Sequence, residues 1–152
     1  MDNRASALNR RLNTDRVITL IVAFLMIFVA AMQFITFARN NDILAVRRGI
    51  HSLFSAIALI LLYLGLNRIA VTGKPFDSKM IGLLRAIAVT IMIGGFLPPF
   101  VEGFINITQG KEFVLMFGDI DIFIPMAGVI VGILSEIFAY GNELQEDNDL
   151  IA

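Results

Sequence analysis

Residues 113–140, FVLMFGDIDIFIPMAGVIVGILSEIFAY, form the most informative segment of this chain. Small and polar residues recur in it at intervals of three and four, which places them on one side of a helix. This packing seam consists of Asp121, Pro125, Gly128, Gly132, Ser135 and Ala139. The other side is bulky and apolar, and in lipid small residues allow two helix backbones to approach closely, as in the G-x-x-x-G pair at Gly128 and Gly132. The segment therefore predicts a membrane-spanning helix that packs through its small face.

The composition is also that of a membrane protein. The chain has 152 residues, of which 57% are hydrophobic and 16% are charged, and its mean hydropathy is +0.80. Soluble domains carry about 25% charged residues. The net charge of −1 provides no basic field that would indicate direct binding of nucleic acid. Because the chain has no cysteine and one histidine, disulfides and thiolate metal sites are excluded, and we predict neither a metal site nor a cofactor.

Apolar segments predict an all-α, polytopic membrane protein, a bundle of four transmembrane helices in a single domain, residues 1–152. The predicted spans are about 17–38, 50–71, 79–104 and 113–140, followed by an acidic tail, 141–152. The first span has twenty-two residues without a charge, about 33 Å of helix. A signal peptide has an apolar core of only about 7–15 residues. We therefore expect an uncleaved span.

Prolines predict where helices end or bend, because proline removes a backbone donor and disfavours helical geometry in the preceding residue. Pro98 and Pro99 lie near the end of the third span, so we expect that helix to terminate near Leu97. Pro125 is expected to interrupt the fourth span and to leave the carbonyl of Asp121 without a partner.

The distribution of positive charge predicts the orientation. Lysines and arginines of short loops accumulate in the cytoplasm. The segments on the same side as the N-terminus carry seven, and those on the other side carry four. We therefore expect both termini in the cytoplasm.

That topology sorts the charges within the membrane into two candidate sites. Arg85 and Glu136 lie at similar depth near the inner face, and we predict an ion pair between them. An outer polar cluster consists of Arg47, Arg48, His51, Glu102, Asp119 and Asp121. Ionisable groups at mid-bilayer cost at least about 2.5–3.5 kcal/mol on insertion scales, so mutual pairing is one interpretation of both sites. A transport or ligand site in the outer cluster is the other.

The tail carries four acids after the last span, Glu143, Glu146, Asp147 and Asp149. Negative charge is unfavourable at the C-terminus of a helix because of the macrodipole. Either the helix extends through the tail, or the acids serve another purpose, such as binding a partner. A solvated, solubilising end is the alternative interpretation.

Two motifs resemble the bacterial domain-of-unknown-function 2975 family. The first is Thr72-Gly73-Lys74-Pro75-Phe76 leading into Leu83-Leu84-Arg85. The second is Leu134-Ser135-Glu136-Ile137-Phe138, followed by Gly141, Glu143-Leu144-Gln145-Glu146 and Asn148-Asp149-Leu150. The resemblance implies a small four-span membrane protein without an established activity. Members are often encoded beside small helix-turn-helix regulators, which implies a partner that is sensed or sequestered.

The functional hypothesis is a regulatory or interaction protein whose cytoplasmic tail contacts a soluble partner such as a small DNA-binding regulator. The other predicted partner is the lipid bilayer, and a homo-oligomer is also compatible with the sequence. The alternative is a small transporter or channel that uses the outer acidic cluster. A polar cavity across the midplane would favour transport, and a dry core would favour regulation. We predict no catalytic residues and no enzyme, because nothing resembles a nucleophile with its base.

Overall fold

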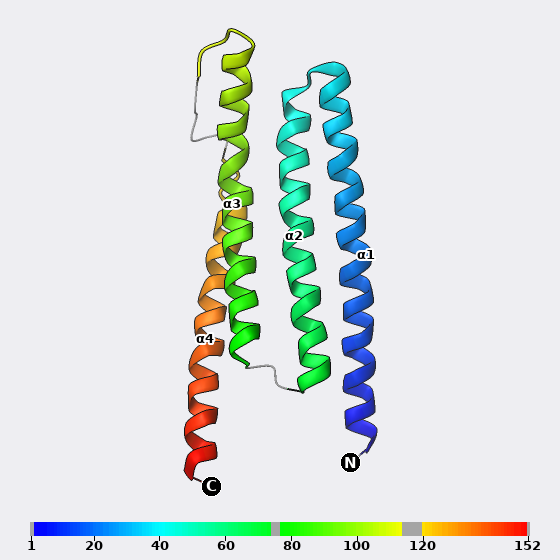
Figure 1. Cartoon of the computed structure of the whole chain (residues 1–152), viewed down its shortest axis with the longest axis vertical. Coiled ribbons are helices and arrows are strands. Elements are labelled where there is room, and N and C mark those ends of the chain that lie inside the picture. The colour runs from blue at the N-terminus through cyan, green and yellow to red at the C-terminus, as the bar shows by residue number, and fades with distance from the viewer. Residues whose placement is uncertain (1, 74–76, 114–119, 152) are drawn as a thin grey trace.

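The computed structural model describes residues 2–73, 77–113 and 120–151, which form four long helices and no strand. These are α1 (Asp2–Asn40), α2 (Ile43–Thr72), α3 (Ser78–Thr108) and α4 (Phe123–Ile151). Each is long and apolar enough to cross a membrane, so the chain is an all-α, multi-pass membrane protein, as the sequence predicts. Figure 1 shows successive helices running in opposite directions, with both termini at one end. We call this end the terminal end and the other the far end.

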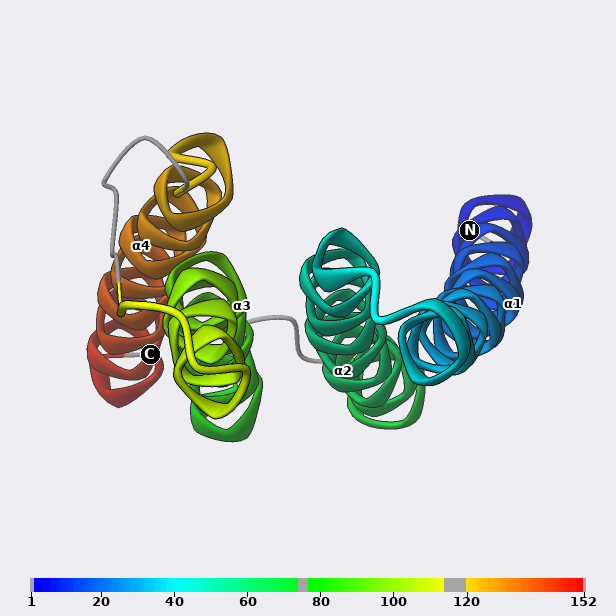
Figure 2. The same cartoon turned by 90° about the horizontal axis from the view of Figure 1, so that it is seen from above.

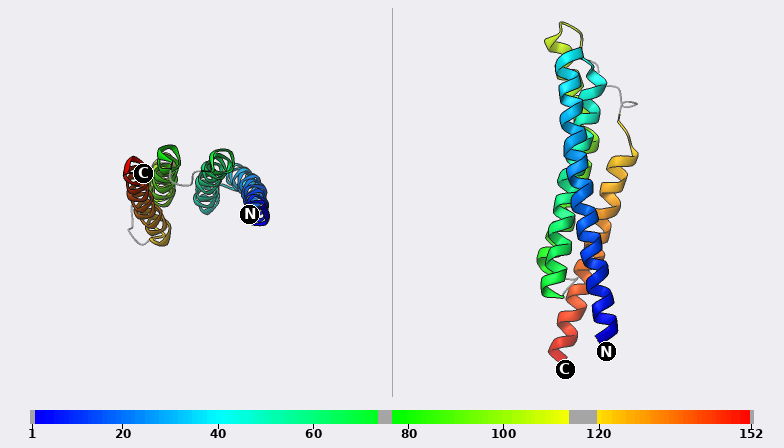
Figure 3. Two further views of the ribbon diagram at one scale, coloured as in Figure 1. Left: turned by 90° about the horizontal axis from the view of Figure 1, so that it is seen from below. Right: turned by 90° about the vertical axis from the view of Figure 1, so that its right-hand side faces the viewer.

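The four helices form an open row. α1 packs on α2, α2 on α3, and α3 on α4. Figures 2 and 3 show α1 and α4 at the two edges of the row. Apolar side chains on these edge helices are therefore exposed, for example Phe24 at 64% and Ile137 at 61%. Such surfaces are typical of helices that face lipid, and the predicted bundle is an open layer rather than a closed ring.

The connection between α1 and α2 consists of only two residues. Asn41 adopts the left-handed conformation, with φ of 53°, which asparagine tolerates better than most residues. Asp42 caps α2, and its side chain accepts a hydrogen bond of 3.0 Å from the backbone N–H of Leu44. The second span therefore begins well before the predicted residue 50. Arg47 and Arg48 lie on the helix and not in a loop.

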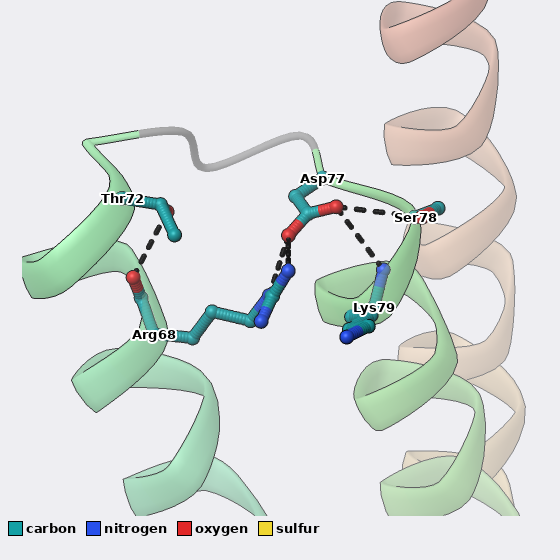
Figure 4. A network of polar contacts seen from close by, with 5 residues as sticks. All are labelled: Arg68, Thr72, Asp77, Ser78 and Lys79. Carbon is teal, nitrogen blue, oxygen red and sulfur yellow. Dashed lines mark hydrogen bonds and ion pairs between the residues drawn. The ribbon is translucent and has the colours of Figure 1, made fainter.

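An ion pair closes the turn between α2 and α3 (Figure 4). Gly73, with φ of 67°, caps the C-terminus of α2, and Asp77 caps α3 by accepting from the backbone N–H of Lys79. The same carboxylate binds the guanidinium of Arg68 on α2. This hydrogen bond with Arg68 lowers the pKa of Asp77. One carboxylate thus joins the ends of two consecutive helices.

α3 continues through Pro98 and Pro99 to Thr108, so the predicted termination near Leu97 is wrong. The physical reason is that α3 is surrounded by lipid and not by water. Each proline removes only one donor from the helix, whereas unwinding would expose many backbone groups to lipid, which cannot bind them. Both prolines are buried. The carbonyls of Gly94 and Gly95, four residues earlier, are the acceptors that lose their helical donors.

α4 begins at Phe123, and Phe113, the predicted start of this span, lies outside it. Pro125 is therefore in the first turn, where a backbone N–H has no acceptor within the helix, and it does not interrupt the span. The carbonyl of Asp121, predicted to be unpaired, accepts from Ile124 at 3.1 Å. Its side chain accepts from the N–H of Phe123 at 3.2 Å. At the other end α4 passes through the acidic tail as helix.

Candidate functional site

The small face of α4 packs on α3, with a close contact at Gly128. A Cβ at that position would lie 2.6 Å from Cγ of Met92 and 2.9 Å from the carbonyl oxygen of Ala88. At Gly132 the nearest atom to such a Cβ is that of Ala88, at the ordinary contact distance of 3.7 Å. Within the G-x-x-x-G pair, α4 therefore approaches α3 more closely at Gly128 than at Gly132.

The other predicted seam residues differ in their packing. Pro125 and Ser135 are buried, and the hydroxyl of Ser135 donates to the carbonyl of Gly132 at 2.6 Å. Ala139 is only partly buried. Asp121 is exposed and precedes the helix, so it lies outside the packed face.

A second pair of glycines, not predicted from the sequence, allows α3 to pack on both neighbours at one level. A Cβ at Gly94 would lie 2.6 Å from Cβ of Phe54 on α2. A Cβ at Gly95 would lie 2.6 Å from Cδ of Pro125 on α4. The signal in the sequence is the spacing of four between this glycine pair and the proline pair that follows. It marks a helix that tolerates proline and has close neighbours on both sides.

At the far end, Arg47 on α2 and Glu102 on α3 form a bidentate ion pair. Nε of Arg47 donates to Oε1 of Glu102 at 2.9 Å, and Nη2 donates to Oε2. The side chains are 25% and 11% exposed. Two parallel charge-assisted hydrogen bonds in a poorly solvated place fix both the separation and the rotation of the helices. The pair is a clamp between α2 and α3.

His51 lies one turn further into the membrane on α2. Its imidazole approaches the carbonyl of Gly94 and is close enough to Asp121, Arg47 and Glu102 to sense their charges. Its Nδ1 is buried and has no hydrogen-bond partner in the described part of the chain. The side chain also lines a cavity of about 80 Å³. His51 is thus the unsatisfied member of the predicted outer cluster.

The remaining members of the outer cluster are less closely associated. Arg48 is exposed, and Asp119 lies outside the described residues. Asp121 is engaged in capping α4. The structure therefore brings together Arg47, Glu102 and His51, with Asp121 nearby. Within the described ranges no group of His, Asp and Glu could hold a metal ion.

Arg85 of α3 and Glu136 of α4 also form the predicted ion pair, with hydrogen bonds of 3.0 and 3.1 Å. Their side chains are 55% and 66% exposed. The pair therefore connects the two helices on the outer surface rather than within the protein. We attribute less stabilisation to it than to the clamp at the far end.

Arg16 on α1 makes a contact that was not predicted from the sequence. Its guanidinium donates to the side chain of Asn67 on α2 and lies 5.8 Å from the ring centroid of Tyr63. A cation over an aromatic face is attracted by the ring quadrupole. In the sequence, Arg16 is distinguished by its position at the start of the first apolar segment, but no sequence pattern identifies Asn67 and Tyr63 as its partners.

At the terminal end, α4 carries the acidic tail beyond its apolar span, which ends at Leu144. Glu143 and Asp147 are exposed and four residues apart, on one face of the helix. The side chains of Glu146 and Asp149 lie outside the described set. The predicted partner-binding tail is thus a straight continuation of a membrane helix.

No family model matches this chain, and neither a curated protein nor a solved structure matches it. The resemblance to the domain-of-unknown-function 2975 family stays a prediction.

Proposed function

We propose that this protein is an interaction protein of the bacterial inner membrane, with both termini in the cytoplasm. The helical extension of α4 binds a soluble partner with a basic surface, such as a small helix-turn-helix regulator. The observation that carries this proposal is the continuity of α4 from Phe123 to Ile151. A continuous helix holds its acids at a defined distance and rotation relative to the membrane.

The placement of the acids supports binding rather than helix stability. α4 has no basic residue in its last turn, although positive charge is favourable there. Glu143 and Asp147, at the spacing where like charges repel on a helix, are exposed. A basic partner would offset both effects. DNA-binding regulators have such surfaces because they neutralise phosphates.

The cavities within the membrane favour interaction over transport. A hollow of about 390 Å³ along α3 and a cavity of about 310 Å³ between α2, α3 and α4 are lined by apolar side chains. The cavity beside His51 is polar but has only about 80 Å³. None of these three cavities connects the outer cluster with Arg85 and Glu136 through a polar lining. Cavities without a continuous polar lining favour a regulatory role over transport.

Affinity purification from native membranes tests the proposal. The test variant combines Glu143→Gln, Glu146→Gln, Asp147→Asn and Asp149→Asn, and the control is Asp15→Asn on α1, at the same end of the molecule. We expect the control to retain a basic partner and the test variant to lose it while still inserting into the membrane. Binding should weaken as salt rises, because exposed charges are screened over about 8 Å at physiological ionic strength. A partner retained equally by both variants, or no basic partner at all, would refute the proposal.

A further inference from the structure

α2, α3 and α4 together form an apolar groove. Figure 2 shows α2 and α4 on either side of α3, and a cavity of about 310 Å³ is lined by residues from all three helices, including Leu62, Ile87 and Leu134. Known ligand pockets have volumes of about 300–1,000 Å³. The groove is therefore large enough for a hydrocarbon chain.

The polar cavity beside His51 adjoins the groove. Ile91 of α3 lines both cavities. On α4 the lining residues extend from Ile124 in the polar cavity to Phe138 in the apolar one. This separation corresponds to about 21 Å along a helix, more than half of the roughly 30 Å hydrocarbon core of a bilayer. The combined site is long and narrow, with one polar end.

Three polar groups surround the cavity at that end. Nδ1 of His51 is buried without a partner, the carbonyl of Gly94 has lost its helical donor because residue 98 is a proline, and Ser55, an exposed residue, also lines the cavity. A neutral imidazole that donates from Nε2 to the carbonyl of Gly94 leaves Nδ1 as an acceptor. Because a buried, unsatisfied acceptor is unfavourable, this end of the site favours a ligand that donates a hydrogen bond.

Size and charge restrict the head group of that ligand. The cavity of about 80 Å³ corresponds to two or three water molecules, at roughly 30 Å³ each. The nearest charges already have partners, because Arg47 binds Glu102 and Asp121 caps α4. Because no Lys, Arg, Asp or Glu side chain among the described residues lines the cavity, a charged head group would find no counter-ion within it. A hydroxyl group meets these conditions.

We propose that this groove binds a single-chain lipid with an uncharged hydroxyl head. The chain lies along α3 between α2 and α4, and the hydroxyl donates to Nδ1 of His51. This site lies between the membrane-spanning parts of the helices, and the proposal does not depend on the proposed function of the α4 extension.

Photo-crosslinking of the full chain in phosphatidylcholine vesicles tests this assignment. Three probes carry the same diazirine-bearing alkyl chain and end in a hydroxyl, a methyl or a carboxylate group. We expect the alcohol to label Leu62 and the buried Ile87 in the groove in preference to the exposed Ile60 and Ile133, and about fivefold more than the alkane, from one hydrogen bond. Equal labelling by alcohol and alkane, or stronger labelling by the acid, would overturn the proposal without any variant.

Two matched pairs of variants locate the head and the chain. His51→Phe should abolish the preference for the alcohol over the alkane, whereas Leu53→Phe, at an exposed position two residues away, should preserve it. Leu62→Trp should fill the groove and prevent labelling of the buried Ile87 by all probes, whereas Ile60→Trp, at an exposed position, should not. Circular dichroism of each variant establishes that it is folded. A preference that survives in folded His51→Phe would contradict the assigned head position.

Discussion

Alanine at Gly128 should destabilise the protein, whereas alanine at Gly132, one turn away on the same face of α4, should not. At Gly128 the new Cβ meets Cγ of Met92 at 2.6 Å and two backbone atoms, the carbonyl oxygen of Ala88 at 2.9 Å and the nitrogen of Met92 at 3.1 Å. Backbone atoms cannot rotate away, so α4 must move outward. At Gly132 the new Cβ contacts only Cβ of Ala88, at 3.7 Å.

The expected magnitudes follow from these contacts. Forcing an extra carbon into a packed interface costs about 1–3 kcal/mol. Replacing glycine by alanine in a helix contributes about 0.5–1 kcal/mol of stability, and this contribution applies to both variants and cancels in their difference. We therefore expect Gly132→Ala to be as stable as the wild type or slightly more stable. Gly128→Ala should be about 1–3 kcal/mol less stable than Gly132→Ala.

The assay is reversible unfolding of the purified protein in mixed micelles, followed by helical circular dichroism as the denaturing detergent fraction rises. Equal unfolding free energies for Gly128→Ala and Gly132→Ala would show that α3 and α4 do not approach each other as described. A loss of stability in Gly132→Ala but not in Gly128→Ala would show that the closer contact with α3 is at Gly132 and would contradict the structure.

Three further measurements address the ion pairs, the turn and the topology. Glu102→Gln removes the carboxylate that binds the largely buried guanidinium of Arg47 and should lower the free energy of unfolding by about 3 kcal/mol. Glu136→Gln, in an exposed pair, should lower it by less than about 1 kcal/mol. Similar losses for the two variants in the same assay would contradict this ranking. Since Arg68 lowers the pKa of Asp77, the wild type has stability that is fully present above about pH 3.9 and is lost as the pH falls through the lowered pKa. Asp77→Asn should therefore have a flatter acid limb of the stability profile, and an unchanged limb would exclude this role. Single cysteines at Ser6 and Asn142 should be shielded from an impermeant thiol reagent in intact cells, and one at Gln109 should be labelled; external labelling at Asn142 would reverse the orientation.

The amino-acid sequence by itself determines that the protein lies in lipid rather than in water. Long apolar segments can be satisfied in lipid only as helices, because every backbone group must find its partner within the segment. The number of helices and the small face of α4 follow from this constraint and from residue spacing. The pair of Arg85 and Glu136 could also be anticipated, because antiparallel neighbours bring residues of similar depth together.

Helix ends were predicted less well, because the outcome depends on local capping and on burial. Asp42 and Asp121 cap helices at positions that hydropathy alone places within a loop and within a span, respectively. Pro98 and Pro99 appear in the sequence as a stop, but in the structure they are buried within a continuous helix. A proline in the first turn and a proline within a helix look alike until the start of the helix is known.

Only the tertiary structure decided which residues of each candidate site lie together. The bidentate clamp of Arg47 and Glu102 depends on the rotation of α2 against α3, and the close contact of Gly94 with Phe54 lies in the same interface. The unsatisfied Nδ1 of His51 and the groove that begins beside it involve three helices. Periodicity shows which face of one helix is small or polar. It carries no information about the distance and rotation between helices, which arise from the packing of side chains across their interfaces.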